Sequence, residues 1–406
     1  MLTRLRNTFN AFPRQFWLVA LGVLISSIGS SLIWPFQLIY ASKILQQPIA
    51  TVASLISISS FAGMAVSFLG GSIADRFGRK PVMFAAVLAH GLAYLLMSRA
   101  TTYVGFLVPM TLMGAAMPFH AVGSDAMMAD IIPPADRNRA YSILRMFSNA
   151  GIAIGPAIGG FIVSRSYTLA FYGAAAGMLA YSLILLFFVR ETLRRQEHQQ
   201  TESLLENLRD YRRVLADRRY VRVVAAITFG MIAPLMMWTL FAVYTKTYFG
   251  LPEYLYSWLP ITNALMCVFV QYFVTLFTRK HEPVRMAALG MFVYALGVGS
   301  VALMSNFWGF WVSMIILTFG ELILVPTGTT YAANRAPADL RGRYMTVYWF
   351  TWGLARAAAP LVGGLLNDQI APQAIWYGGL AIGTVSAVIL LALAREKKGE
   401  GISAGG

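Results

Sequence analysis

The stretch GSIADRFGRKP, residues 71–81, joins two long apolar runs and combines three kinds of residue that a tight helix connection needs. Gly71 permits close approach of a neighbouring helix, and Gly78 permits a sharp turn. Asp75 can accept hydrogen bonds at a helix end and face the N-terminus of another helix. The positive charges of the stretch are Arg76, Arg79 and Lys80.

The composition around this stretch is typical of a membrane protein. Of 406 residues, 58% are hydrophobic and 12% are charged, whereas soluble domains usually carry about 25% charge. The net charge of +15 comes from residues between apolar runs, so we expect membrane lipids and no nucleic acid as partners. The single cysteine, Cys267, lies inside an apolar run and predicts no intrachain disulfide.

Apolar runs long enough to cross a bilayer recur along the whole chain. A crossing helix needs about 20 apolar residues. By this measure the sequence predicts an all-α membrane protein with twelve transmembrane helices. We expect these helices at 16–42, 50–73, 81–98, 103–131, 140–164, 169–189, 222–246, 255–277, 285–304, 307–332, 344–367 and 373–394.

Lysine and arginine are divided unequally between alternate loops. If the N-terminus is cytoplasmic, the outward loops contain only a few of the 32 basic residues, namely Lys43, Arg99, Arg165 and Lys246. Nearly all the others face the cytoplasm, as the positive-inside rule requires. The sequence therefore predicts a multi-pass cell-membrane protein with both termini cytoplasmic. Its short loops are typical of a bacterial inner membrane.

The longest polar stretch divides the chain into two halves. We expect an N-terminal six-helix bundle at 1–189, a linker at 190–221 and a C-terminal six-helix bundle at 222–406. Apolar residues recur in the linker at helical spacing, so it is predicted to be an amphipathic helix on the cytoplasmic face. Two interpretations stay open: a linker anchored by anionic headgroups, or a basic regulatory segment.

The two halves resemble each other in sequence. PPADRNRAYSIL from Pro133 parallels APADLRGRYMTV from Ala336, and Pro156 matches Pro360 at an offset of 204 residues. The endings Arg190-Glu191 and Arg395-Glu396 also match, at an offset of 205. A six-helix unit is therefore repeated in parallel, which is a common transporter architecture with the substrate site near the midplane.

The stretch 71–81 resembles the loop motif of the major facilitator superfamily, G-x-x-x-D-R-x-G-R-[RK], and matches it completely. The resemblance covers essentially the whole chain and is greatest to twelve-helix drug:proton antiporters. It implies that the motif is a gating latch that stabilises the outward-facing state. From its place at the membrane interface we also expect Asp130 to pair with Arg79 or another loop arginine and to be released on gating. Simple positive-inside topology would explain the arginines and the lysine but not Asp75 or the glycines.

The fifth predicted helix carries a second motif, Gly151-Ile-Ala-Ile-Gly155-Pro156-Ala-Ile-Gly159-Gly160. It resembles the G-x-x-x-G-P-x-x-G-G signature of the antiporter branches of that superfamily. Glycines four residues apart also give one smooth helix face for a close partner, and proline kinks a helix locally. Packing and antiport interpretations are compatible here.

One expected feature of drug antiporters is missing. Their fourth helix often carries Arg four residues before Gly, but the register set by Gly114 places Met110 there. Arg145 in the fifth helix is a candidate substitute, with snorkelling to the interface as the alternative.

Several charged residues lie inside predicted helices, where each costs roughly 2.5–3.5 kcal/mol on insertion scales. Glu321 is the first candidate proton carrier and Asp125 the second. Glu321 has the alternative role of a permanent ion pair with Arg356 that holds the C-terminal half together. Arg356 has the alternative role of binding an anionic group of the substrate.

Polar and aromatic residues within the helices are candidates for lining a substrate cavity, although packing is the commoner role of such residues. They are Trp34, Gln37, His120, Asn149, Trp238, Asn263 and Trp352. His90 and His120 share no ligand spacing with another histidine, cysteine or carboxylate, so we expect no metal site. His120 has proton relay and packing as alternatives.

We expect a secondary transporter and not an enzyme, because the chain shows no nucleotide-binding loop and no nucleophile–base arrangement. The expected activity is proton-coupled efflux of lipophilic drugs or other amphipathic small molecules by alternating access, with no cofactor. The alternatives are export of an anionic metabolite or a lipid, and a non-transporting membrane receptor.

Overall fold

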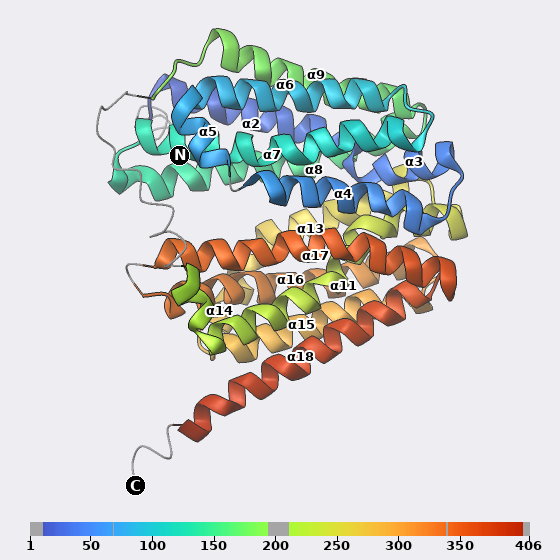
Figure 1. Ribbon diagram of the computed structural model, residues 1–406. Coiled ribbons are helices and arrows are strands. Elements are labelled where there is room, and N and C mark those ends of the chain that lie inside the picture. Colours follow the sequence, from blue (N-terminus) through green and yellow to red (C-terminus); the bar gives the residue numbers. More distant parts are fainter. Residues whose placement is uncertain (1–10, 68, 194–210, 338–339, 401–406) are drawn as a thin grey trace. The chain divides into compact units, whose positions relative to one another are not determined.

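The computed structural model describes residues 11–67, 69–193, 211–337 and 340–400 (Figure 1). All regular elements of this described part are helices. The chain is divided into two compact units. Unit 1 comprises Met1–Gln46, Ile58–Gln196 and Pro252–Ile261, and unit 2 comprises Gln47–Ser57, Glu197–Leu251 and Thr262–Gly406.

The first half of the chain forms α2 (Arg14–Ile33), η1 (Trp34–Phe36), α3 (Gln37–Leu45), α4 (Ile49–Ser67), α5 (Gly70–Phe77), α6 (Arg79–Met97), α7 (Tyr103–Ile131), η2 (Pro134–Asp136), α8 (Arg137–Val163) and α9 (Tyr167–Phe187). The second half forms α11 (Arg218–Phe249), α12 (Glu253–Tyr256), α13 (Trp258–Phe269), α14 (Gln271–Thr278), α15 (Pro283–Ser300), η3 (Val301–Leu303), α16 (Phe307–Arg335), α17 (Arg341–Gln369) and α18 (Ala374–Glu400).

Ten helices of the described chain are long and apolar enough to cross a membrane, or eleven if one bent pair counts as a single span. The helix α17 is long enough, but it is not among the helices apolar enough to be counted. The predicted number of twelve spans and the cytoplasmic position of the termini therefore stay predictions. Most of the predicted linker helix falls on residues 194–210, outside the described part, although residues 211–216 are helical.

The sequence repeat is also a structural repeat. Five helices of the first half begin 204 residues before their counterparts: α2 and α11, α4 and α12, α6 and α15, α7 and α16, α8 and α17. The packing repeats as well, because α2 packs on α8 and α9 just as α11 packs on α17 and α18. The internal duplication is thus confirmed, and an offset of 204 relates equivalent residues within these helices.

Two predicted single helices are broken at nearly equivalent places. The predicted helix 50–73 is divided into α4 and α5, and the predicted helix 255–277 is bent by 56° between α13 and α14. No glycine or proline stands at residues 268–272, so nothing in the sequence signals the second break. At this break the Gln271 side chain contacts α16.

The glycines of the second motif bring α8 against α2. A side-chain carbon added at Gly151 or Gly155 would collide with α2, at Ser27 and Ser31 respectively. A carbon added at Gly159 would collide with the backbone of Leu32. The smooth face expected from the four-residue spacing is therefore present, and its partner is α2.

We expect Gly155→Leu to destabilise unit 1, because α2 and α8 would have to separate to admit the new side chain. Overpacking of this kind typically costs about 1–3 kcal/mol. Thermal unfolding of the purified protein in detergent measures the effect. Ala150→Leu is the matched control, since it adds volume at an exposed position of the same helix. Equal unfolding temperatures for the two variants would contradict the packing role.

Candidate functional site

Glu321 lies at the middle of α16, fourteen residues from either end of the helix. The Asn263 side-chain amide donates to Glu321 Oε2 at 2.8 Å and also contacts Thr318 Oγ1 at 3.1 Å. The hydroxyl of Tyr294, a buried residue of α15, is a further hydrogen-bond partner of the carboxylate. Three helices therefore meet at one carboxylate, and both of these donors are neutral.

The break between α13 and α14 belongs to this site. Pro326 has no backbone N–H, so it cannot bond the carbonyl of Leu322 four residues earlier in α16. The side-chain amide of Gln271 donates to that carbonyl at 3.1 Å and to Thr275 Oγ1 at 3.0 Å. Pro326 thus leaves the Leu322 carbonyl, next to Glu321 in the sequence, without its helical hydrogen bond. The side chain of Gln271, the first residue of α14, supplies a hydrogen bond in its place.

The alternative ion pair of Glu321 with Arg356 is not present, because no ion pair in the described part of the chain joins the two residues. Arg356 is exposed on α17, and no described residue forms a hydrogen bond or ion pair with it. The first candidate carboxylate and the first candidate cation are therefore separate features of unit 2.

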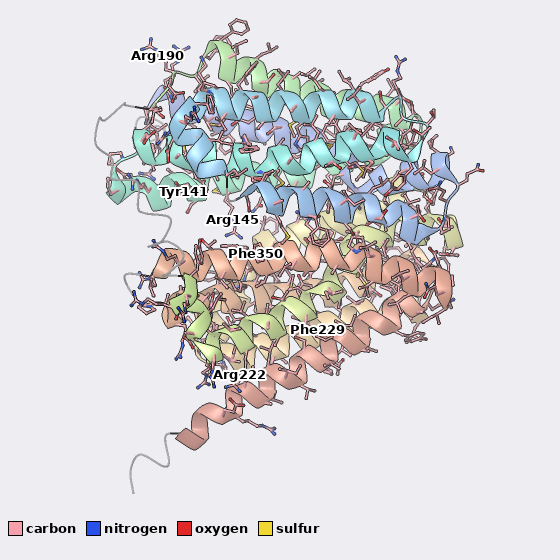
Figure 2. All side chains as sticks on the ribbon, in the orientation of Figure 1. Tyr141, Arg145, Arg190, Arg222, Phe229 and Phe350 are labelled. Atoms are coloured by element: carbon pink, nitrogen blue, oxygen red, sulfur yellow. The ribbon has the colours of Figure 1, made fainter. Side chains whose placement is uncertain are left out.

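The two candidates from the first half lie on exposed helix faces. Asp125 of α7 and Arg145 of α8 are both exposed, and no described residue forms a hydrogen bond or ion pair with either side chain. Arg145 is labelled in Figure 2. The Tyr141 hydroxyl donates to the backbone carbonyl of Asp125 at 3.2 Å and leaves the carboxylate unbonded.

The cavity candidates divide between packed and exposed positions. Gln37 is buried, and its amide contacts Met97 Sδ at 3.6 Å. Asn263 is buried against Glu321, whereas Trp34 and Asn149 are exposed. Trp238 and Trp352 are half-buried.

The two histidines that looked unrelated in the sequence are neighbours in unit 1. His120 Nε2 lies 3.3 Å from the Tyr181 hydroxyl, and His90 is within electrostatic range of His120. Among the described residues no group of three or more histidine, cysteine, aspartate or glutamate side chains could hold a metal ion.

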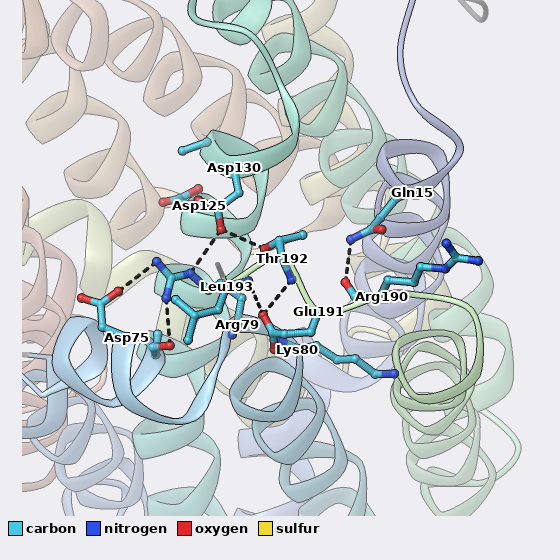
Figure 3. A network of polar contacts seen from close by, with 12 residues as sticks. Gln15, Asp75, Arg79, Lys80, Asp125, Asp130, Arg190, Glu191, Thr192 and Leu193 are labelled. Carbon is cyan, nitrogen blue, oxygen red and sulfur yellow. Dashed lines mark hydrogen bonds and ion pairs between the residues drawn. The ribbon is translucent and has the colours of Figure 1, made fainter. Parts of the chain in front are cut away.

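The loop motif forms a second polar site, in unit 1 (Figure 3). The Arg79 guanidinium lies 3.0 Å from Asp75 and 3.3 Å from Asp130, and it donates to the carbonyl of Ala74 at 3.2 Å. The pair expected between Asp130 and a loop arginine is thus present. Arg76 points elsewhere and lies over the ring of Phe77.

Glu191 holds this motif from the segment that follows α9, a role that the sequence analysis missed. Its carboxylate accepts the backbone N–H groups of Arg79 and Lys80 at 3.1 and 3.0 Å, which begin α6. It also accepts those of Thr192 and Leu193, each at 2.8 Å. The repeated Arg-Glu pair at 190–191 was the available signal.

Two separate features require glycine at position 78, between α5 and α6. Its φ of 100° lies in the region that favours glycine. A side-chain carbon at this position would also collide with the Glu191 carboxylate. Thr192 connects Asp130 and Glu191. Its hydroxyl donates to Asp130 at 2.8 Å and its backbone N–H donates to Glu191, so the two carboxylates belong to one network (Figure 3).

Burial alone raises the pKa of Glu191, but the four backbone N–H bonds outweigh it and hold the pKa below its ordinary value of 4.5. The folded protein therefore favours the ionised carboxylate at the N-terminus of α6, where the helix dipole also stabilises negative charge.

The comparisons with known proteins agree with this architecture. A model of the Major Facilitator Superfamily matches residues 19–360. The chain is a multi-pass membrane protein of a transporter fold. It belongs to the major facilitator superfamily, as its loop motif indicated.

Individual relatives are similar at low identity. The chain is 25% identical to a Na(+), Li(+), K(+)/H(+) antiporter of Planococcus maritimus over 376 residues, covering 86% of each chain. It is 23% identical to the multidrug resistance protein MdtH of Proteus mirabilis over 336 residues, covering 82% of each. A solved peptide transporter POT in complex with sulfate has the same fold, with a TM-score of 0.77, 15% identity and 95% of each chain covered.

We expect Glu191→Ala to lower the unfolding temperature by about 1–3 °C, because a lost helix cap typically costs about 0.5–2 kcal/mol. Glu396→Ala is the matched control. It occupies the corresponding Arg-Glu pair of the second half and forms an exposed ion pair with Arg222 at 3.1 Å, a kind of contact that contributes little. An equal decrease of the unfolding temperature in both variants would contradict a capping role for Glu191.

The contribution of Glu191 should also depend on pH. Its folded-state pKa lies below 4.5, so the stabilisation is complete above that pH and is lost as the pH falls further. Thermal unfolding of the wild type and of Glu191→Gln, compared at pH 7 and at about pH 3, measures this dependence. The difference between the two proteins should be smaller at the lower pH. A constant difference would mean that the ionised carboxylate is not the stabilising species.

Proposed function

We propose that this protein is a secondary active transporter that exports lipophilic or amphipathic small molecules from the cell in exchange for protons. Alternating access of one site to the two sides of the membrane, driven by the proton gradient, would move the cargo. Glu321 is the coupling residue, and Asp125 is the second candidate for this role.

The observation that carries the proposal is the surroundings of Glu321. Its carboxylate lies at mid-helix, receives hydrogen bonds from Asn263 and Tyr294, and has no counter-cation among the described residues. An ionised group inside a membrane is costly unless it is paired or neutralised. A bound proton or a cationic group of the cargo would remove that cost equally well.

Proton and cargo would therefore compete for one carboxylate. Binding of a proton favours release of the cargo, and binding of a cationic cargo favours release of the proton. This competition is the minimum requirement for exchange transport. Asn263 is suited to it, because its amide can donate to the carboxylate in one state and accept from the carboxylic acid in the other.

The network of Arg79, Asp75 and Asp130 suits the role of a gating latch in this transporter. Its ion pairs link the ends of α5, α6 and α7, and Glu191, in the segment after α9, binds the first backbone N–H groups of α6. Partly exposed ion pairs of this kind are individually weak. They could therefore open and re-form within each transport cycle.

The names of two relatives describe activities of the same class as the proposed one. One relative is named as a cation/proton antiporter and another as a multidrug resistance protein. Inorganic cations therefore belong in the same test as lipophilic cations.

A second candidate function rests on Arg356. This exposed arginine lies within α17, and no described residue is bonded to it. It suits the binding of an anionic group, so export of an anionic metabolite or a lipid is the competing proposal. A non-transporting membrane receptor on the same fold is the third.

Transport into proteoliposomes under an imposed pH gradient distinguishes these proposals. The panel contains lipophilic cations, inorganic cations, anionic metabolites and fluorescent lipids. We expect gradient-driven movement of lipophilic cations by the wild type. We expect Glu321→Gln to reduce this movement to the level of protein-free liposomes, because the glutamine amide is uncharged and cannot take up and release a proton.

Two controls accompany this experiment. Glu396→Gln removes an exposed carboxylate and should transport like the wild type. Ligand-induced thermal stabilisation should persist in Glu321→Gln for any cargo that does not rely on the negative charge. Full gradient-driven transport by Glu321→Gln would remove Glu321 from the coupling role, and movement of anions or lipids alone would place Arg356 in the substrate site.

A further inference from the structure

Each unit contains one short segment from the other half of the chain. Gln47–Ser57, which includes the start of α4, belongs to unit 2, and Pro252–Ile261, which includes α12 and the start of α13, belongs to unit 1. The two segments occupy equivalent places in the repeat, because α4 and α12 begin 204 residues apart. We call them the exchanged segments.

In unit 2 the exchanged segment is held by the end of α17. Asp368 Oδ1 accepts the backbone N–H of Ile49 at 3.2 Å, and Asp368 Oδ2 accepts that of Ala50 at 2.8 Å. Pro48, which directly precedes α4, has no side-chain oxygen that could cap the helix. A carboxylate 319 residues further along the chain therefore supplies the cap of α4.

Further contacts of α17 support this cap. The side-chain amide of Asn367 donates to Asp368 Oδ1 at 2.8 Å, and the Tyr248 hydroxyl donates to Asn367 Oδ1 at 3.0 Å. A side-chain carbon at Gly364, one turn earlier in α17, would collide with the backbone of Ala50. The exchanged segment thus meets α17 in a close backbone approach that ends in a carboxylate cap.

Unit 1 holds its exchanged segment at the equivalent place with different chemistry. A side-chain carbon at Gly160, the equivalent of Gly364, would collide with Ser257. The carboxylate is here part of the exchanged segment. Glu253, the first residue of α12, is buried and accepts the Tyr167 hydroxyl at 2.7 Å. The close packing is therefore repeated in the two units, whereas the polar contact is not.

The residues of the two polar contacts have no acidic or phenolic counterpart in the other half. At an offset of 204, the equivalents of Asp368, Glu253 and Tyr167 are Ser164, Ile49 and Ala371. Each unit thus adds its own carboxylate contact to a packing arrangement that both share.

The distribution of basic residues predicts that both contacts lie at the outer end, away from the cytoplasm. The exchanged segments follow the loops of Lys43 and Lys246, and α8 leads to the loop of Arg165, all of which are predicted to face outward. Alternating access requires the outer end to open in one state. If the units part there during transport, each must release the segment that it holds.

We infer that Asp368 and the Tyr167–Glu253 pair determine how readily the outer end opens, because each holds one exchanged segment and has to break when that end opens. This inference rests on the alternating access of the proposed function. The Asp368 cap suits a contact that breaks and re-forms in each cycle, since Asp368 is exposed and water can replace it on the two N–H groups.

The remainder of α4 has its own attachment to unit 1. The Ser59 hydroxyl donates to the backbone carbonyl of Met110 at 2.6 Å, and a side-chain carbon at Gly63 would collide with the backbone of Gly114. Loss of the Asp368 cap therefore leaves α4 packed on α7 and frees only the exchanged segment.

Labelling of Ala50→Cys from outside intact cells tests the inference. Ala50 packs against Gly364, so a thiol there is shielded while unit 2 holds the segment. The reagent is a membrane-impermeant maleimide, and peptide mass spectrometry distinguishes this site from Cys267. In Asp368→Ala we expect the labelling rate to rise about 5- to 30-fold, the population change that corresponds to loss of a helix cap.

Asn306→Ala is the matched control. Asn306 caps α16 within unit 2 by accepting the backbone N–H of Gly309 at 3.0 Å, so its loss removes a cap that involves no exchanged segment. It should lower the unfolding temperature about as much as Asp368→Ala and leave the labelling of Ala50→Cys unchanged. Asp368→Asn keeps one acceptor oxygen and should give an intermediate labelling rate.

Thr51→Cys reports on the side of the membrane, because Thr51 is exposed on the same segment. It should be labelled from outside at the same rate with Asp368 and with Asp368→Ala. A Thr51→Cys protein that is labelled only after the cells are opened would place the contacts at the cytoplasmic end and overturn the inference.

The exchanged segment of unit 1 gives the second test. Ser257 is buried against Gly160, so Ser257→Cys should be shielded. Tyr167→Phe removes the hydroxyl that holds Glu253 and should raise the labelling rate at least about fivefold. Tyr172→Phe, on the same helix, removes a hydroxyl that binds Arg99 and should leave the rate unchanged.

The outcomes separate this inference from the coupling role of Glu321, because labelling needs neither cargo nor a gradient. If Asp368→Ala and Tyr167→Phe lower the unfolding temperature without changing the labelling rates, the contacts are structural and the inference is wrong. If the labelling rates rise as expected while Glu321→Gln retains gradient-driven transport, the inference stands and the proposed coupling role falls.

Discussion

The structure depends on one constraint: in a bilayer every backbone N–H and C=O must find its partner within the protein. Helices satisfy this requirement locally, and so every regular element of the described chain is helical. A proline in a helix breaks the rule at one carbonyl. In α16 that carbonyl belongs to Leu322, and the Gln271 side chain satisfies it. The Gln271 side chain at the bend between α13 and α14 thus meets this requirement for the residue that follows Glu321.

Much of this arrangement could be predicted from the sequence. The loop motif indicated the superfamily, and the repeated segments gave the offset that five helix starts share. The pair of Arg79 and Asp130 could also be predicted, because opposite charges at the ends of neighbouring helices have few other partners. Glu321 was identifiable because a carboxylate inside an apolar helix costs free energy, which makes a functional role the first hypothesis.

The remaining features depend on contacts between distant residues, which periodicity cannot reveal. Glu191 lies 112 residues from Arg79 in the sequence, and it looks like an ordinary loop carboxylate until the fold places it at the start of α6. Asn263 lies 58 residues from Glu321. Sequence reasoning offered Arg356 as the partner because opposite charge is visible in a sequence, whereas a neutral amide gives no such signal.

The structural repeat has an evolutionary consequence. The offset of 204 aligns Gly159 with Gly363 and Pro156 with Pro360, so helix packing is what both copies inherited. It aligns Arg79 with Pro283 and Glu321 with Met117, so neither of these charged residues has a charged counterpart in the other half. A gene built in this way could acquire a different ionisable residue in one copy without a matching change in the other, and one scaffold could give rise to carriers with unrelated cargo.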